Sequence, residues 1–251
     1  MSQAVLTFSF LGVAGAAAGV IGTAGGITSL VAYPALLAVG IPPLAANVTN
    51  SVALVGSGLA SASRAAPDVA GQGRVIRRWM PASVALSLAG AVLLVVTPGS
   101  VFGRVVPFLV AAGSLTLLAQ PRISRWQESS GRAPGRAGVS AALGAVALYN
   151  GYFGAGSGIL LIALLLIAGE PVLHRANAAK NVILAASDLL PAVLFAVTAP
   201  VVWSAAIPLG AGTVAGGLIG PSVARRVNPA VLRVLIAGMG LALAAWLLFS
   251  S

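Results

Sequence analysis

Two groups of polar residues lie within otherwise apolar sequence, and their residue types suit the binding of a small solute. In chain order they are Asn47, Thr49 and Asn50, and then Asn177, Lys180 and Asn181. Within each group the two asparagines are three or four residues apart, so they share one face of a helix. Carboxamides and hydroxyls hydrogen-bond an oxyanion without adding net charge, and Lys180 would add one cation. The pattern therefore predicts a site for a small anion.

Lys180 lies inside an apolar segment, where a charged side chain is costly. Insertion scales put that cost at about 2.5–3.5 kcal/mol, so such a residue has a functional or paired role by default. The alternative is a lysine that extends its amine to the cytoplasmic boundary near Arg175.

Asp188 follows Lys180 by eight residues, which places both on nearly the same helix face. Because a carboxyl group away from water can exchange a proton, we hypothesise that Asp188 couples transport to protons. The alternative is an ion pair or hydrogen bond to Lys180 or to a backbone group, without a role in transport.

Two glycine-rich stretches, at 22–26 and 151–158, interrupt the apolar segments at corresponding places. Irregular backbone at membrane depth is tolerated only beside protein or a water-filled cavity. A helix that begins after such a break directs unpaired N–H groups toward it, which favours an anion. The alternative is close helix packing through small residues. The residues assigned to the site from these breaks are Gly25, Gly26, Gly154, Gly156 and Ser157.

Tyr149 and Asn150 precede the second break, and they either line the same cavity or belong to an aromatic belt at the membrane interface. Glu170 and His174 are assigned to a solvated loop.

The elements that must position these residues are ten apolar segments. Their approximate bounds are Ala4–Ile21, Ile27–Val39, Leu44–Ser63, Trp79–Thr97, Arg104–Ala119, Ala137–Tyr149, Ile159–Gly169, Ala176–Thr198, Val201–Val223 and Pro229–Phe249. A helix needs about 20 residues to cross a bilayer. The second, sixth and seventh segments are shorter, and they are interpreted as broken or re-entrant helices.

The two halves of the chain resemble each other. The block Ala46–Leu54 aligns with Ala176–Leu184, and Gly40–Pro42 aligns with Gly169–Pro171 upstream of it. The sequence therefore predicts two membrane repeats, residues 1–119 and 137–251, joined by a solvated cytoplasmic linker at 120–136.

The distribution of arginines indicates the orientation of these segments. With the N-terminus outside, nearly all arginines fall in inner loops, Arg104 alone lies outside, and Lys180 falls within a segment. Both termini are then expected outside. Because each repeat has five segments, an odd number, the second repeat must be inserted in the opposite direction, as in many secondary transporters.

Composition excludes several classes of protein. The 251 residues are 59% hydrophobic and 7% charged, with a mean hydropathy of +1.02, so the chain cannot cover a soluble fold with polar surface. Continuous apolar runs favour helices over a β-barrel. The net charge of +10 reflects loop arginines, so no nucleic-acid partner is expected. Without cysteine and with a single histidine, no metal site, cofactor or catalytic residue is predicted.

At these motifs the chain resembles the TauE/SafE family of membrane transporters, known for export of sulfite and organosulfonates. The resemblance rests on Gly25-Gly26 followed by Pro34, and on the stretches 45–51, 149–158 and 177–181. The first break is poorer in glycine than is usual for the family, and Asn150 replaces an acidic residue frequent among relatives.

The resemblance implies a small-anion carrier in a bacterial inner membrane, and the family's dimeric habit suggests a homodimer. We therefore expect an all-helical polytopic membrane protein of inverted repeats that moves sulfite, a sulfonate or a related oxyanion by alternating access. No ATP-binding motif is present. The alternatives are a cation or metal permease and a non-transporting membrane scaffold or assembly factor.

Overall fold

The computed structural model describes residues 3–25, 28–65, 68–129, 136–168, 172–224 and 229–249. In these ranges the chain is helical and contains no strand, which confirms the predicted fold class. Ten helices form: α1 (Gln3–Gly25), α2 (Ser29–Ala38), α3 (Pro43–Ala65), α4 (Gly73–Val96), α5 (Gly99–Ser129), α6 (Arg136–Tyr152), α7 (Ser157–Ile167), α8 (Leu173–Thr198), α9 (Trp203–Ala224) and α10 (Pro229–Phe249).

Four helical stretches are long and apolar enough to cross a membrane: Gln3–Gly22, Gly73–Val96, Gly99–Ala119 and His174–Thr198. The outer surface of the bundle is apolar as well. Val197 is 79% exposed and Trp246 is 59% exposed, and large apolar side chains also cover the outer faces of α1, α4 and α9. Such a surface suits lipid and not water.

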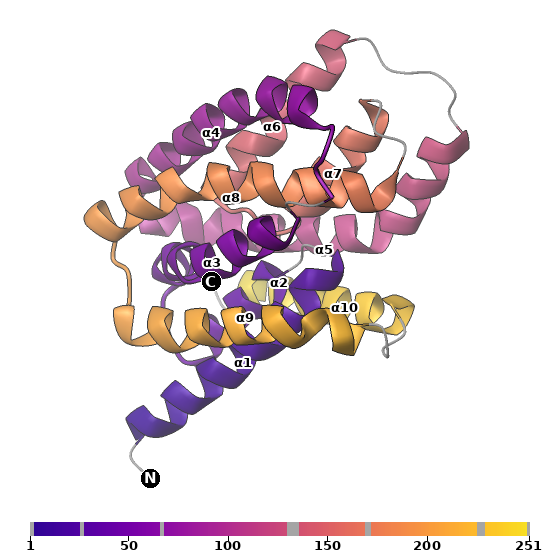
Figure 1. Ribbon diagram of the computed structural model, residues 1–251. Coiled ribbons are helices and arrows are strands. Elements are labelled where there is room, and N and C mark those ends of the chain that lie inside the picture. The colour runs from indigo at the N-terminus through magenta and orange to yellow at the C-terminus, as the bar shows by residue number, and fades with distance from the viewer. Residues whose placement is uncertain are drawn as a thin grey trace.

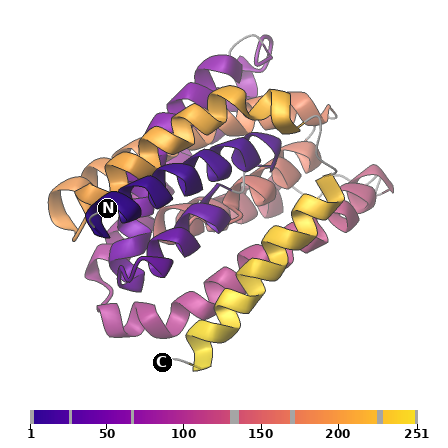
Figure 2. The same ribbon diagram turned by 90° about the horizontal axis from the view of Figure 1, so that it is seen from below.

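One layer contains α1, α3, α4, α6, α8 and α9, and a second group behind it contains α2, α5, α7 and α10 (Figures 1 and 2). In the layer α3 and α8 lie together at the centre, α9 packs on α3, and α4 packs on α8. The outer places are taken by α1 against α9 and by α6 against α4. Behind them α5 runs beside α10, and the short helices α2 and α7 contact both this pair and the layer.

The packing pattern repeats when each helix is replaced by its equivalent in the other half. The pair α1 and α9 becomes α6 and α4, and the pair α3 and α9 becomes α8 and α4. The pairs α3–α8 and α5–α10 map onto themselves, so they lie on a pseudo-twofold axis. The last turn of α3, with Arg64, lines one cavity together with His174 at the start of α8. These equivalent helices therefore run in opposite directions, as inverted repeats require.

Glycines allow the outer pairs to pack very closely. A Cβ atom at Gly15 would overlap the carbonyl oxygen of Leu209, and one at Gly216 would overlap that of Ala16. In the equivalent pair, a Cβ at Gly90 would overlap the carbonyl oxygen of Leu148. Small residues that let helix backbones approach are the usual means of association in membranes, where burial from water contributes little.

Several helix boundaries differ from those predicted. Most of the linker assigned to 120–136 is helical, because α5 continues to Ser129 and α6 begins at Arg136. Its Arg, Gln and Glu residues favour a helix as readily as a loop. Similarly, α4 begins at Gly73 and not at Trp79, and it places the Arg78 guanidinium 4.7 Å from the Trp79 ring centroid.

The first break is also shorter than predicted. α1 continues through Gly22 to Gly25, and α2 begins at Ser29. Gly22 is needed for packing and not for a turn, because a Cβ there would overlap the Thr28 hydroxyl. The predicted shortness of the second and seventh segments is confirmed, whereas α6 reaches 17 residues.

Neighbouring glycines of α9 provide a test of this packing. Gly216→Ala should destabilise the protein, because its new methyl group meets the Ala16 backbone, and overpacking costs about 1–3 kcal/mol. Gly217→Ala is the matched control, since no atom lies within 4 Å of its Cβ position and the gain in helix propensity is the same. The measurement is thermal stability in detergent, and equal melting temperatures for the two variants would contradict the described contact.

Candidate functional site

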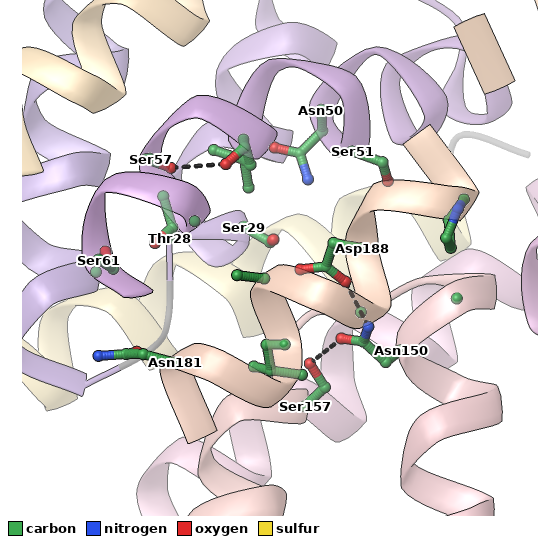
Figure 3. Close-up of a pocket in the computed structure, with 18 of the residues that line it drawn as sticks. Thr28, Ser29, Asn50, Ser51, Ser57, Ser61, Asn150, Ser157, Asn181 and Asp188 are labelled. Carbon is green, nitrogen blue, oxygen red and sulfur yellow. Dashed lines mark hydrogen bonds between the residues drawn. The ribbon is translucent and has the colours of Figure 1, made fainter. Parts of the chain in front are cut away.

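A cavity of about 140 Å³ lies among α1, α3, α6, α7 and α8, beside the two places where the helices are interrupted. Figure 3 shows the polar side chains around it, with Asn50, Ser51, Ser57 and Ser61 on α3 opposite Asn181 and Asp188 on α8. Of the residues assigned to the site from the sequence, the cavity is lined by Asn50, Asn150, Gly154, Ser157, Lys180, Asn181 and Asp188.

The second break brings the chain to the cavity through two glycines with left-handed backbone. Gly154 has φ +78° and Gly156 has φ +81°, a region that other residues rarely adopt. Gly156 also packs on α5, where a Cβ would come within 3.2 Å of Gly113 Cα. α7 then starts at Ser157, whose side chain faces the cavity. At the first break Gly25 ends α1, while Gly26 lies outside the described residues.

Amides at the starts of the two short helices are used in local turns. The Ser157 N–H donates to the Gly154 carbonyl at 3.1 Å, and the Ile159 N–H donates to the Gly156 carbonyl at 3.1 Å. At α2 the Ala32 N–H donates to the Thr28 carbonyl at 3.0 Å.

Asp188 belongs to a hydrogen-bonded cluster that joins four helices. The Asn150 amide donates to the Asp188 carboxylate at 2.6 Å and to the Ser87 hydroxyl at 3.3 Å. The Ser157 hydroxyl in turn donates to the Asn150 carbonyl oxygen at 2.5 Å. Both N–H groups of Asn150 and its oxygen are thus engaged, so Asn150 and Ser157 hold Asp188 in place (Figure 3).

In the part of the chain that the structure describes, Lys180 and Asn50 differ from the residues of this cluster in their lack of hydrogen-bond partners. Lys180 is 4% exposed and Asn50 is 2% exposed, yet both line the cavity. Within the described residues Lys180 makes no hydrogen bond or ion pair, with Asp188 or otherwise, and the side-chain oxygen of Asn50 is buried without a partner. Unpaired buried polar groups cost free energy, and a bound ligand would remove part of that cost.

Other residues assigned from the sequence hold the helices together and do not line this cavity. The Asn47 amide donates to the Tyr152 carbonyl at 3.0 Å, and the Thr49 hydroxyl accepts from the Val202 N–H at 3.0 Å. The Tyr149 hydroxyl donates to the Ala155 carbonyl at 2.6 Å. Gly156 is buried against α5.

A second cavity of about 260 Å³ continues the first toward the end of α3, because both are lined by Ser57, Ser61 and Asn181. Arg64, Asp68, His174 and Asn177 surround it. His174 was expected in a loop, but it lies in the first turn of α8 because the helix starts at Leu173. Glu170 lies outside the described residues.

The opposite side of the first cavity is closed by aromatic rings. Phe153, which lines the cavity, packs edge-on against Tyr33 at 5.4 Å between centroids. Phe102 lies 6.3 Å from Phe153 and 5.9 Å from Tyr152. The cavity therefore opens toward Arg64 and His174 and is blocked in the direction of the rings.

Sequence reasoning missed two kinds of lining residue. Ser57 and Ser61 lie 7 and 11 residues after Asn50, close to two and three helical turns, so the face that they share with Asn50 could have been found from the 3.6-residue period. Thr28, which lines the cavity, and Ser87, which bonds to Asn150 behind its wall, carry no such signal, because each is a single hydroxyl with no periodic partner in the sequence.

An all-helical bundle with an apolar outer surface, inverted repeats and a central polar cavity defines a multi-pass membrane protein of the transporter type. The family model "Sulfite exporter TauE/SafE" matches residues 11–247. The chain therefore belongs to the TauE/SafE family, which is named as a family of membrane transporters.

Three relatives are similar over nearly their full lengths. A "Probable membrane transporter protein ORF9" of Sinorhizobium sp is 29% identical, covering 96% of this chain and 92% of the relative. One "Probable membrane transporter protein" of Haemophilus influenzae is 27% identical, covering 88% and 86%. Another, YfcA of Escherichia coli K12, is 25% identical, covering 93% and 87%. No solved structure matches the chain significantly.

The cluster around Asn150 predicts a difference between two cavity asparagines. Asn150→Leu should lower the thermal stability, because the Asp188 carboxylate and the Ser157 hydroxyl both lose a partner, at about 1–3 kcal/mol for each buried group left unsatisfied. Asn181→Leu is the control, since Asn181 lines the cavity without a hydrogen bond in the described part of the chain. Melting curves in detergent make the comparison, and a control that is destabilised equally would refute the special role of Asn150.

Proposed function

We propose that this protein is a secondary transporter that moves a small oxyanion, such as sulfite or a sulfonate, across the inner membrane by alternating access. The observation that carries this proposal is that Lys180 and Asn50 are buried on the wall of one cavity, and that within the described residues neither the Lys180 amine nor the Asn50 amide N–H makes a hydrogen bond. A lysine amine and a carboxamide N–H are both donors, and together they suit an anion. The family's name supports a sulfur oxyanion as the first solute to test.

The local charge supports an anion over a cation. In the first cavity the charged side chains among the described residues are Lys180 and Asp188. Asp188 already accepts a hydrogen bond from Asn150, so one carboxylate and no other acid would remain to hold a metal ion. Divalent cations that bind oxygen ligands require several such groups.

The direction in which the cavity opens suggests which conformation is described. Its mouth lies beside Arg64 and His174, at the end of the bundle that the positive-inside rule assigns to the cytoplasm. The ring cluster around Phe153 closes the other side. In this interpretation the solute reaches the site from the cytoplasm in the described state and leaves past the rings in the alternate state.

Lys180→Asn tests the proposal directly. Hydrogen bonds to a charged group contribute about 1.5–3 kcal/mol, so apparent affinity for the anion should fall roughly ten- to a hundredfold. The assay measures sulfite flux in proteoliposomes that contain the purified protein, followed by a panel of sulfonates and carboxylates.

Arg104→Gln is the control for net charge, because Arg104 is exposed and bonds to the Ser100 carbonyl of its own helix. It should leave flux unchanged. Flux that is insensitive to the anion but changes with the cation would favour a permease for cations. Absence of flux for every anion would favour a scaffold.

We further propose that Asp188 carries a proton together with the anion. If Lys180 and Asp188 are both charged, the empty cavity is neutral, and an arriving anion leaves one net negative charge in a medium of low dielectric constant. A proton on Asp188 removes that charge. Asn150, which bonds to Asp188, and Ser157 and Ser87, which bond to Asn150, do not titrate. Among the described residues Lys180 is the other charged group that lines the cavity.

Asp188→Asn should separate anion flux from proton flux. The variant keeps an amide able to replace the carboxyl group in the cluster, so the protein should fold and carry the anion down its own gradient. An imposed pH gradient should no longer drive accumulation, as read from a pH-sensitive dye trapped in the proteoliposomes. Retention of the wild-type proton-to-anion ratio would overturn the coupling role.

A further inference from the structure

The cavity has matching residues from the two repeats on its wall. In the alignment that pairs Ala46 with Ala176, Asn50 pairs with Lys180 and Ser51 pairs with Asn181. All four residues line the cavity. Leu54 and Leu184 are a third such pair, again with both members on the wall.

Continuing the same alignment along the helices pairs Gly58 with Asp188, and both of these residues line the cavity too. The alignment of Gly40 with Gly169 pairs the helix starts Thr28 and Ser157, which are also on the wall. The cavity is therefore centred on the pseudo-twofold axis on which α3 and α8 pack.

The chemistry of the wall does not follow this symmetry. Each charge lies in the second repeat, where Lys180 and Asp188 stand opposite the neutral Asn50 and Gly58. Space remains at one of the neutral positions, since a Cβ at Gly58 would have no atom within 4 Å. Lys180 and Asn50 are equivalents of each other, and within the described residues neither the Lys180 amine nor the Asn50 amide N–H makes a hydrogen bond.

We infer that the solute binds on the pseudo-twofold axis, bridged by Asn50 and Lys180, and that a positive charge serves equally well from either position. This inference rests on the proposed function and adds the position of the ligand and the role of Asn50 as its second, neutral donor. A solute held at the axis lies in the same relation to residue 50 as to residue 180. One bound to the second repeat alone would not.

The test moves the charge from one repeat to the other. The chain has no cysteine, so Asn50→Cys combined with Lys180→Asn creates one reactive thiol in a folded protein. Treatment with aminoethyl methanethiosulfonate then attaches a side chain that ends in an ammonium group, while methyl methanethiosulfonate attaches a neutral one. Sulfite flux in proteoliposomes is measured before and after each treatment, with mass spectrometry to establish that labelling is complete.

Ser57→Cys with Lys180→Asn is the matched control. Ser57 lines the same cavity from the same helix, but its equivalent Ser187 bonds to the Ile183 carbonyl and does not line it. We expect the ammonium group to restore at least a third of wild-type flux at position 50, and to restore almost none at position 57. The neutral reagent should restore none at either position.

Recovery at both positions would overturn the inference, because any cation in the cavity would then suffice. Lack of recovery at position 50 after complete labelling would overturn it as well, since the charge would act only from the second repeat. The proposed function fails separately if the Lys180→Asn protein, without any introduced cysteine, transports sulfite as fast as the wild type.

Discussion

Lys180 is a cation held within an apolar helix bundle, and among the described residues no carboxylate pairs with it. A buried charge is stable only when its surroundings compensate for the lost water. Here the compensation is a cavity lined by hydroxyls and amides, reached from the end where Arg64 and His174 lie. The serine face of α3 and the two helix interruptions all serve to keep polar groups around a place where apolar side chains would otherwise pack.

The hydrogen bonds that the polar residues of the site already make decide which of them could still bind a solute. Asn150 has no donor left for a solute, because its two N–H groups are used by Asp188 and Ser87. Asn47 and Thr49 are likewise committed to carbonyl and amide groups at the ends of neighbouring helices. The Lys180 amine and the Asn50 amide N–H have no such partner within the described residues, which is why they are the donors proposed for the solute.

Much of this arrangement could be predicted from the sequence. Hydropathy predicted the helices, and the repeated Asn-containing blocks predicted two repeats. The positions of the arginines indicated the orientation that we propose. The helix ends were less predictable, since Gln, Arg and Glu continue a helix beyond the membrane as easily as they leave it, as in α5. The bonds of Asn47 to Tyr152 and of Asn150 to Ser87 and Asp188 could not be predicted, because these partners lie far away in the chain and depend on how α3, α4, α6 and α8 pack.

The exchange of outer helices between the halves has a mechanical consequence. α9 belongs to the second repeat but packs on α1 of the first, and α4 of the first packs on α6 of the second. Glycines bring these pairs so close that their backbones leave no room for a methyl group. A rocking motion that kept each repeat rigid would have to pull those pairs apart. If the protein works by the proposed alternating access, the bodies that move past one another would therefore be composite, each assembled from helices of both halves.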